Sequence, residues 1–236
     1  MTSSKKNNPY GRILLVVDVQ NDFCPGGALG VPGGDELIPA TNRLIELFYK
    51  LGWPIAGTQD WHPPGHISFA SKHPGKKVHD VISLKGVPEQ MLWPDHCVMG
   101  SHGAQFHQEI RHDLFSMITR KGSDPQIDSY SVFFENDRKT TTGFDAFLKK
   151  LRLKEIFLCG LATDYCVYFS AMDALSLGYR VVVVTDACRG VDAPPGNVKR
   201  RLDEMKKSGV LLLESDFLEQ NLPEIDLFAN LAGESQ

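Results

Sequence analysis

Residues 154–188, KEIFLCGLATDYCVYFSAMDALSLGYRVVVVTDAC, decide the fold that we expect for this chain. The two ends of this stretch, 154–162 and 179–188, are dominated by apolar residues and predict strands that are buried on both faces. The segment between them, 164–178, predicts a helix. A strand, a helix and a second strand in this order form the unit that joins neighbouring parallel strands. The stretch therefore predicts an α/β fold built on a mostly parallel sheet.

The same alternation of strand and helix patterns extends in both directions along the 236-residue chain. It brings the predicted sheet to six strands, with helices on both faces. The additional strands are expected at 12–20, 54–60, 115–122 and 210–215, and the additional helices at 35–52, 143–151 and 194–209. We find no internal repeat and no shift of composition. Residues 11–236 are therefore predicted to form a single domain that follows a disordered N-terminal lead at 1–10.

Composition and charge argue against several classes of function. A net charge of -4 gives no electrostatic reason to expect nucleic acid or an anionic membrane as a partner. No apolar run approaches the roughly 18 residues of a membrane span, and the polar start MTSSKKNNPYGR lacks the apolar stretch of a signal peptide. The five cysteines are an odd number and are widely spaced, which favours reduced thiols in the cytoplasm over a disulfide framework.

All eight histidines lie between His62 and His112. They fall in a stretch, 61–112, that is rich in Pro and Gly and shows no strong secondary-structure period. A loop of this length is uncommon in a compact domain unless it carries function. We therefore expect several imidazoles to serve one site, although a local loop insertion would also cluster them.

Three reactive side chains follow predicted strands: Asp18, Lys121 and Cys166. Ligands of open parallel sheets bind at the carboxyl ends of the strands, so these side chains should lie near one another. With Thr163 or Asp164 as the N-cap, Cys166 would lie in the first turn of the next helix. The helix dipole would stabilise a thiolate there, and the unpaired backbone N–H groups of that turn could bind an oxyanion.

Two of these residues also have a structural interpretation. Most free cysteines are buried small apolar residues, and Cys166 taken alone fits that description better than it fits a nucleophile. Asp18 interrupts an aliphatic run and could instead cap a loop or pair with Lys121. An acid and a cation at neighbouring strand ends reverse the balance for Cys166, and pairing with Lys121 would also tune Asp18 as a base.

Asp60 and His62 leave the end of the second predicted strand in the sequence TQDWHPPGH. Alternation along an extended chain would aim both side chains at one ion, and a carboxylate with imidazoles suits zinc, iron or manganese. The pattern is short and occurs often by chance, so alone it is weak support for a metal. His96, in WPDHC, could supply a third protein ligand.

Taken together, these features resemble the isochorismatase-like cysteine hydrolases and, within them, the nicotinamidase/pyrazinamidase group. The resemblance is carried in order, from about residue 13 to residue 190, by VVDVQNDFCPGGAL, TQDWHPPGHISFA, LWPDHCVMGSHGAQFH, the Lys of TRKG, LCGLATDYCV and VVVTDACRG. The segment with the metal-binding residues is what distinguishes this group from the metal-free isochorismatases.

The resemblance implies a role for each matching position. It implies a catalytic triad of Asp18, Lys121 and Cys166, an oxyanion hole of the Ala162 and Cys166 N–H groups, metal ligands Asp60, His62 and His96, and a pyridine pocket of Phe23, Trp93, Leu161 and Tyr130. His66 matches a position that is a fourth ligand in some relatives. The family also carries a cis peptide that corresponds to Leu161–Ala162 here.

The implied activity is hydrolysis of nicotinamide, and also of pyrazinamide, to the acid and ammonia through a thioester on Cys166, which is a step of NAD salvage. One divalent metal ion is implied, with zinc favoured over iron or manganese, and its main role would be to orient the substrate. Nicotinamide is the expected partner, and a homo-oligomer remains open. The alternatives are another amidase or isochorismatase-type hydrolase of the family, or a non-enzymatic zinc or thiol protein, which would not need Asp18 at a strand end.

Overall fold

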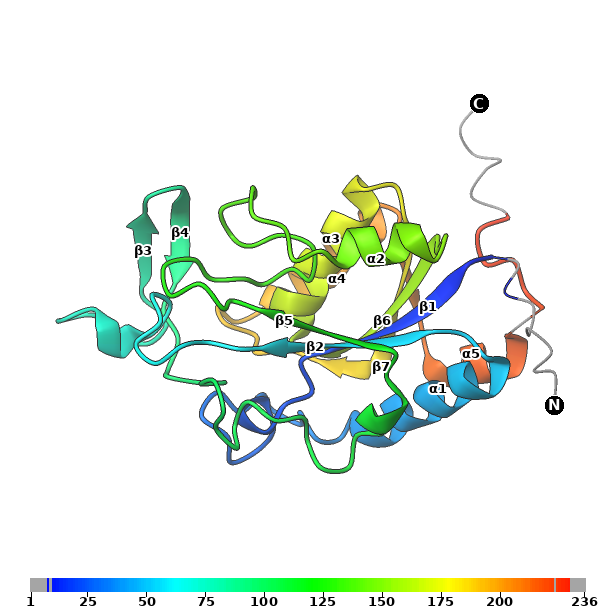
Figure 1. The fold of residues 1–236 in the computed structure, drawn as a ribbon, viewed down its shortest axis with the longest axis horizontal. Helices are drawn as coiled ribbons and strands as arrows, with labels where there is room; N and C mark the ends of the chain where they lie inside the picture. Colours follow the sequence, from blue (N-terminus) through cyan, green and yellow to red (C-terminus); the bar gives the residue numbers. More distant parts are fainter. Residues whose placement is uncertain (1–7, 9, 223, 230–236) are drawn as a thin grey trace.

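The computed structural model describes residues 8, 10–222 and 224–229 (Figure 1). The predicted disordered lead at 1–10 lies almost entirely outside the described residues, so it remains a prediction. The described chain forms a six-stranded sheet in which every neighbouring pair of strands is parallel, as predicted. Its strands, in sheet order, are β5 (Met117–Lys121), β2 (Ile55–Asp60), β1 (Arg12–Val17), β6 (Glu155–Leu161), β7 (Arg180–Arg189) and β8 (Leu211–Leu213).

Helices cover both faces of this sheet, which confirms the predicted three-layer arrangement. Figure 1 shows α1 and α5 on one face and α2, α3 and α4 on the other. Strands β1 and β6 are buried along their whole length because they lie between these two layers. The helices are α1 (Ile38–Leu51), α2 (Phe144–Lys150), α3 (Tyr168–Ser176), α4 (Asn197–Lys207) and α5 (Ser215–Asn221), and a single π-helical turn, η4 (Thr163–Val167), leads into α3.

Helix α1 shows how the sequence sets an element. Pro39 lies in its first turn, where the missing N–H costs nothing, and Leu44, Ile45 and Phe48 form its buried face. Gly52 ends the helix in the left-handed conformation with φ 69°, and its N–H donates to the carbonyls of the last turn. The predicted range, 35–52, is longer than the helix because the segment just before it forms turns.

Two elements were not predicted. The first is an antiparallel hairpin of β3 (Val81–Leu84) and β4 (Val87–Met91), which projects from the sheet inside the stretch expected to be loop (Figure 1). Its strands are short, Pro88 interrupts the second, and β3 is exposed or half-buried, so its hydrophobic alternation is weak. The second is α5, a seven-residue helix whose first residue the sequence assigned to the last strand. Three short 3-10 turns complete the described elements: η1 (Asn21–Phe23), η2 (Ala70–Lys72) and η3 (His112–Leu114).

The order of the strands places the reactive residues together. The chain runs from β1 outward through β2 to β5, then returns to pair β6 on the other side of β1 and continues to β7 and β8. Crevices form where the direction of winding reverses, at the carboxyl ends of the strands. Asp18 follows β1, and Asp60 pairs with Lys121 in the register of β2 and β5. The turn that contains Cys166 follows β6 at the same edge.

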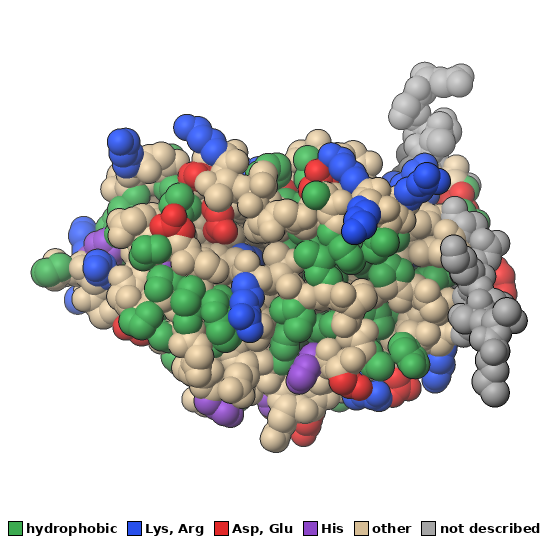
Figure 2. Space-filling model, viewed as in Figure 1, with side chains coloured by type: hydrophobic (Ala, Val, Ile, Leu, Met, Phe, Trp, Pro, Cys, Tyr) green, Lys and Arg blue, Asp and Glu red, His purple; other side chains and the backbone are tan. Residues whose placement is uncertain are grey.

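Three further observations concern the charged surface, the cysteines and the helices. Lys and Arg side chains are scattered among acidic ones on the face that Figure 2 shows. All five cysteines are buried and unpaired, as the sequence predicted. Within the described residues, no helix is both long enough and apolar enough to cross a membrane.

Candidate active site

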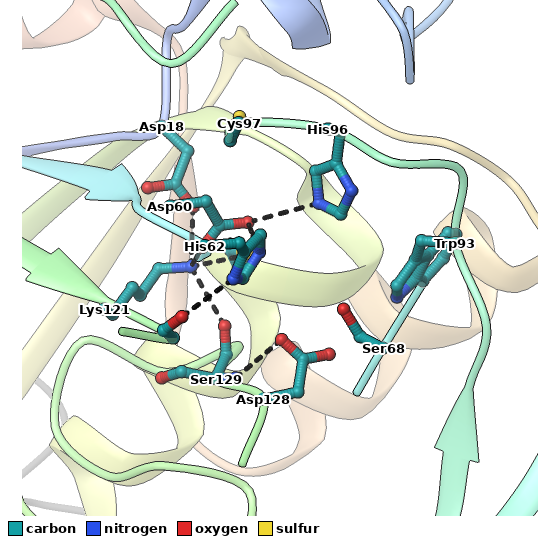
Figure 3. A network of polar contacts seen from close by, with 12 residues as sticks. Asp18, Asp60, His62, Ser68, Trp93, His96, Cys97, Lys121, Asp128 and Ser129 are labelled. Atoms are coloured by element: carbon teal, nitrogen blue, oxygen red, sulfur yellow. Dashed lines mark hydrogen bonds and ion pairs between the residues drawn. The ribbon is translucent and has the colours of Figure 1, made fainter. Parts of the chain in front are cut away.

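Lys121 stands at the centre of a buried polar network at the carboxyl edge of the sheet (Figure 3). Its Nζ lies 2.9 Å from Asp18 Oδ2, 3.3 Å from Cys166 Sγ and 3.1 Å from the carbonyl oxygen of Ser129. It also donates a hydrogen bond to Asp60 Oδ1. The three side chains that the sequence predicted as a triad are therefore in contact, and none is exposed by more than a few per cent.

Burial and the neighbouring charges shift the pKa values of Lys121 and Asp18, the two ionisable partners of Cys166. Burial alone would lower the pKa of Lys121, but the carboxylates of Asp18 and Asp60 outweigh it and hold that pKa well above its usual value. Burial raises the pKa of Asp18, and repulsion from Asp60 adds to this, while Lys121 and the Thr58 hydroxyl oppose it. Lysine is thus a fixed cation in this site, whereas Asp18 is a carboxyl group with a raised proton affinity, as a general base requires.

The hydrogen bonds of Asp18 fix its orientation. The Thr58 hydroxyl on β2 donates to Asp18 Oδ1 at 2.5 Å and accepts from the Asp18 backbone N–H at 3.1 Å. Asp18 itself adopts a positive φ of 48°, an uncommon conformation for a residue with a side chain. These contacts leave Oδ2 directed at the Lys121 ammonium group.

The turn around Cys166 differs from the helix start that the sequence predicted. Neither Thr163 nor Asp164 caps the helix. Ala162 is the N-cap of the π-helical turn η4, which contains Cys166, and Val167 is the N-cap of the helix α3 that follows. The Asp164 carboxylate instead accepts hydrogen bonds from the backbone N–H groups of Val191 and Asp192, at 2.9 and 3.0 Å. It therefore ties the loop after β7 to the turn.

The predicted stabilisation of a resting thiolate is not supported. Burial raises the pKa of the Cys166 thiol well above its usual value; Lys121 opposes this shift, and Asp18 and Asp60 add to it. The helix-dipole argument underestimated the cost of desolvating a thiolate on a fully buried sulfur. Burial therefore favours the thiol form of Cys166, and an adjacent base is needed to take its proton. The peptide bond Leu161–Ala162 just before this turn is cis, as expected from the resemblance.

Asp60, His62 and His96 form a candidate site for a divalent metal ion beside the triad. The Nε2 atoms of His62 and His96 lie 3.6 and 3.7 Å from the same oxygen, Asp60 Oδ2, and all three side chains are buried. The other oxygen of Asp60 accepts the hydrogen bond from Lys121. The Lys121 ammonium group and the two imidazoles outweigh the effect of burial and keep the pKa of Asp60 well below its usual value.

The imidazoles are held in the orientation that a metal requires. Nδ1 of His62 lies 2.9 Å from the Gly122 carbonyl oxygen, and Nδ1 of His96 lies 2.8 Å from that of Pro94. Each ring can therefore donate through Nδ1 and keep the Nε2 lone pair for an ion. Among the described residues, the buried Nε2 of His62 has no hydrogen-bond partner, which a bound cation would explain. One carboxylate and two imidazoles fit zinc, iron or manganese and leave coordination positions open.

Gln20 and Gly122 help to fix the positions of Asp60 and His62. The Gln20 side chain donates from Nε2 to the Asp60 carbonyl and accepts from the Asp60 N–H, both at 2.8 Å. Gly122 has φ 63°, and a Cβ on it would lie only 2.5 Å from the His62 ring. A side chain at position 122 would therefore displace this imidazole.

His66 lies next to the candidate metal site but outside the Asp60 group. Its ring stacks on that of His62 at 4.3 Å between centroids. Its Nδ1 lies 2.8 Å from the Ser68 hydroxyl and its Nε2 lies 3.2 Å from the Ile127 carbonyl oxygen. Both ring nitrogens already have partners, so these contacts favour a second-layer position over a fourth ligand.

A small cavity opens onto both groups of residues. Of the four predicted pocket residues, Phe23, Trp93 and Tyr130 line it, and Leu161 does not, because its side chain is fully buried at the end of β6. The complete lining is Phe23, Leu29, Asp60, Trp93, His96, Asp128, Tyr130, Ala162, Tyr165, Cys166 and Val191. Cysteine sulfur, metal-site residues and aromatic rings thus face the same space.

Four lining residues were missed from the sequence. Leu29, Asp128 and Val191 come from loops with no helical or strand period, and nothing in their local pattern marks them. Tyr165 was quoted beside Cys166 in the motif but given no role. Its ring meets that of Trp93 edge to face at 4.8 Å, and its hydroxyl donates to the Ala193 carbonyl oxygen at 2.6 Å.

Several known proteins are similar to this chain in sequence and in structure. A nicotinamidase of Escherichia coli (strain K12) is 46% identical over 201 residues, which cover 85% of this chain and 93% of that protein. A nicotinamidase/pyrazinamidase structure of Acinetobacter baumanii superposes with a TM-score of 0.85 and 41% identity, covering 90% of this chain and 100% of that one. The pyrazinamidase of Pyrococcus horikoshii, solved in complex with zinc, gives a TM-score of 0.70 and 36% identity, covering 86% and 99%.

The match to the isochorismatase domain spans residues 12–216, from the first residue of β1 into α5. It therefore includes all six strands of the sheet, among them β2 with Asp60, the turn that holds Cys166 and the loops that carry His62 and His96. This chain belongs to the isochorismatase family of hydrolases.

Proposed function

We propose that this chain is an amidohydrolase that converts nicotinamide to nicotinate and ammonia through a thioester on Cys166, and that it also accepts pyrazinamide. One observation carries the proposal: Cys166 and two residues of the candidate metal site, Asp60 and His96, border a single cavity lined by aromatic rings. Asp18 lies behind this cavity and is joined to Cys166 through the Lys121 ammonium group. Such a cavity suits a flat heteroaromatic amide. Relatives named nicotinamidase and pyrazinamidase share at least 36% of their aligned residues with it in the comparisons above.

Formation of the thioester follows from the contacts of Cys166. The Asp18 carboxylate accepts the thiol proton, and the sulfur forms a bond to the carboxamide carbon. Negative charge moves to the carbonyl oxygen, where we place the N–H groups of Ala162 and Cys166 as the oxyanion hole. Asp18 then gives its proton to the departing nitrogen, the carbon–nitrogen bond breaks and ammonia leaves. Lys121 stabilises the sulfur and Asp18 while they carry negative charge.

Hydrolysis of the thioester reuses the same base. Asp18 removes a proton from a water molecule, whose oxygen attacks the thioester carbon. The carbon–sulfur bond breaks, the sulfur regains a proton from Asp18, and the acid is released and loses its remaining proton to solvent to become nicotinate. The aromatic rings that line the cavity hold the substrate ring while both steps take place.

We also propose that Asp60, His62 and His96 hold one divalent cation, with zinc favoured and iron or manganese as alternatives. The zinc complex of the Pyrococcus horikoshii relative and the partnerless Nε2 of His62 support this assignment. When bound, the cation would supply a Lewis acid beside the cavity that Asp60 and His96 line. His66 is assigned to the layer behind these ligands.

A direct assay tests the function: purified protein is incubated with nicotinamide, and ammonia and nicotinate are measured. We expect both products in equal amounts, and pyrazinamide should yield pyrazinoate and ammonia. If neither amide releases ammonia while another carboxamide does, the chain is a different amidase of the same family. If no amide is hydrolysed, the enzymatic proposal is wrong.

The metal assignment predicts the behaviour of His96→Ala. Loss of one of three protein ligands should weaken metal binding by more than the roughly 10- to 100-fold typical for loss of a hydrogen bond behind a ligand. Metal content after dialysis, measured by elemental analysis, checks this, with the exposed His102→Ala as the control. A variant that keeps one tightly bound equivalent would show that another residue, such as His66, is the third ligand.

A further inference from the structure

Gln90 is a fully buried amide on β4 of the hairpin. Fully buried positions are usually occupied by apolar residues. Gln90 does not line the cavity, yet it lies directly behind residues that do. A buried amide that makes no contribution to folding would cost free energy compared with an apolar side chain of the same size. Its contacts therefore indicate what it is for.

Both ends of this amide are used. Gln90 Nε2 donates to Asp128 Oδ2 at 2.7 Å and to the Met91 carbonyl oxygen at 2.8 Å. Its Oε1 accepts a hydrogen bond from Asn136 Nδ2 at 3.3 Å. The Tyr130 hydroxyl lies at 3.5 Å from the same Nε2. The Gln90 side chain thus joins the hairpin to the loop that contains Asp128 and Tyr130, two residues that line the cavity.

The network continues into the wall itself. Asn136 accepts from the Tyr130 backbone N–H at 3.1 Å and donates its own backbone N–H to the Asp128 carbonyl at 2.7 Å. The Trp93 indole N–H donates to the Tyr130 hydroxyl at 3.1 Å. Gln90 and Asn136 therefore hold Asp128 and Tyr130 at both backbone and side chain, and Tyr130 in turn orients Trp93.

Resting on the function proposed above, we propose that Gln90 is a positioning residue for the ring pocket: it sets the separation of Tyr130 and Asp128 from Trp93 and so determines how tightly the aromatic amide is bound. Asp18, Lys121 and Cys166 are attached to the sheet and to η4, and none of them touches Gln90 in the contacts of the described residues. Loss of Gln90 should therefore act on binding more than on the chemical steps.

Gln90→Leu tests this, with the exposed Gln126→Leu as a matched control on the loop of Asp128. Leucine removes the hydrogen bonds that Gln90 makes to Asp128 Oδ2 and Asn136 Nδ2, a cost that corresponds to a shift of about tenfold in an equilibrium. We expect KM for nicotinamide to rise about tenfold while kcat changes less than about threefold, and the control to match wild type. A fall in kcat with unchanged KM, or no change in either, would overturn the proposal.

A second pair of variants separates positioning from a general loss of packing. Gln90→Glu keeps the shape of the side chain but sets a carboxylate against Asp128, so it should also raise KM. Asp128→Asn in the same chain restores a donor and an acceptor to the pair, and the double variant should recover part of the loss. If the two substitutions simply add, Gln90 does not act through Asp128.

A measurement of nicotinate binding by calorimetry keeps this inference distinct from the proposed function. The dissociation constant should be about tenfold higher for Gln90→Leu than for wild type, whether or not either turns over nicotinamide. Equal dissociation constants for the two proteins would remove the role of Gln90 alone. A wild-type protein that binds nicotinate but hydrolyses no amide would remove the hydrolase function alone.

Discussion

Replacing Cys166 with alanine should lower the rate of nicotinamide hydrolysis by about four orders of magnitude or more, because the substitution removes the atom that bonds to the substrate. No other thiol can substitute for it among the described contacts of Lys121 and Asp18. The exchange removes one buried sulfur from a small side chain, so the fold should persist. Ammonia release under saturating nicotinamide is the measurement.

The matched control is Cys159→Ala, which removes a thiol of equal burial on β6. Its sulfur faces the Leu15 carbonyl oxygen inside the sheet, away from the cavity. This variant should keep wild-type activity within a few-fold, and both variants should keep their metal content. Retention of a substantial fraction of wild-type rate by Cys166→Ala would remove the thioester from the mechanism.

The sequence predicted the parts of this molecule that depend on short-range pattern. Short β-branched and apolar runs that alternate with helical patterns predicted all six strands of the sheet, and polar residues at the ends of these runs pointed to Asp18, Asp60 and Lys121. The carboxyl ends of parallel strands lie at the same edge of the sheet, so residues that are far apart in the chain could be predicted to lie close together. The resemblance to a family then supplied His96 as a ligand more firmly than spacing could.

The parts of the site that the sequence did not predict depend on contacts between loops, and these contacts leave no pattern in the local sequence. Asp128 and Gln90 come from segments of irregular sequence, and their importance appears only once the hairpin has folded against the loop after β5. The state of Cys166 was mispredicted for a related reason. Its expected place in the first turn of a helix suggested a stabilised thiolate, but burial of the whole site, which is a property of the assembled loops, is the largest influence on its pKa.

Asp18→Asn should lower turnover by about three to four orders of magnitude, since proton transfer by a positioned base contributes up to roughly that much. The raised pKa of the Cys166 thiol makes the base indispensable, because few molecules carry a thiolate without it. Asparagine keeps the size of the side chain and can still bond to Thr58, so the site should remain assembled. The exposed Asp35→Asn is the matched control and should behave as wild type.

The pH dependence of the wild-type enzyme gives the same prediction a second readout. Asp18 must be ionised to accept the thiol proton, and burial, reinforced by Asp60, raises its pKa. As pH falls through that raised value the base becomes protonated, so kcat/KM should fall on the acid side, at a higher pH than an ordinary aspartate would give. In Asp18→Asn the remaining activity should lack this acid limb. Mass spectrometry of the variant mixed with nicotinamide should show little acyl-enzyme in the first turnover; a thioester that forms as fast as in wild type would assign the first proton transfer to another group.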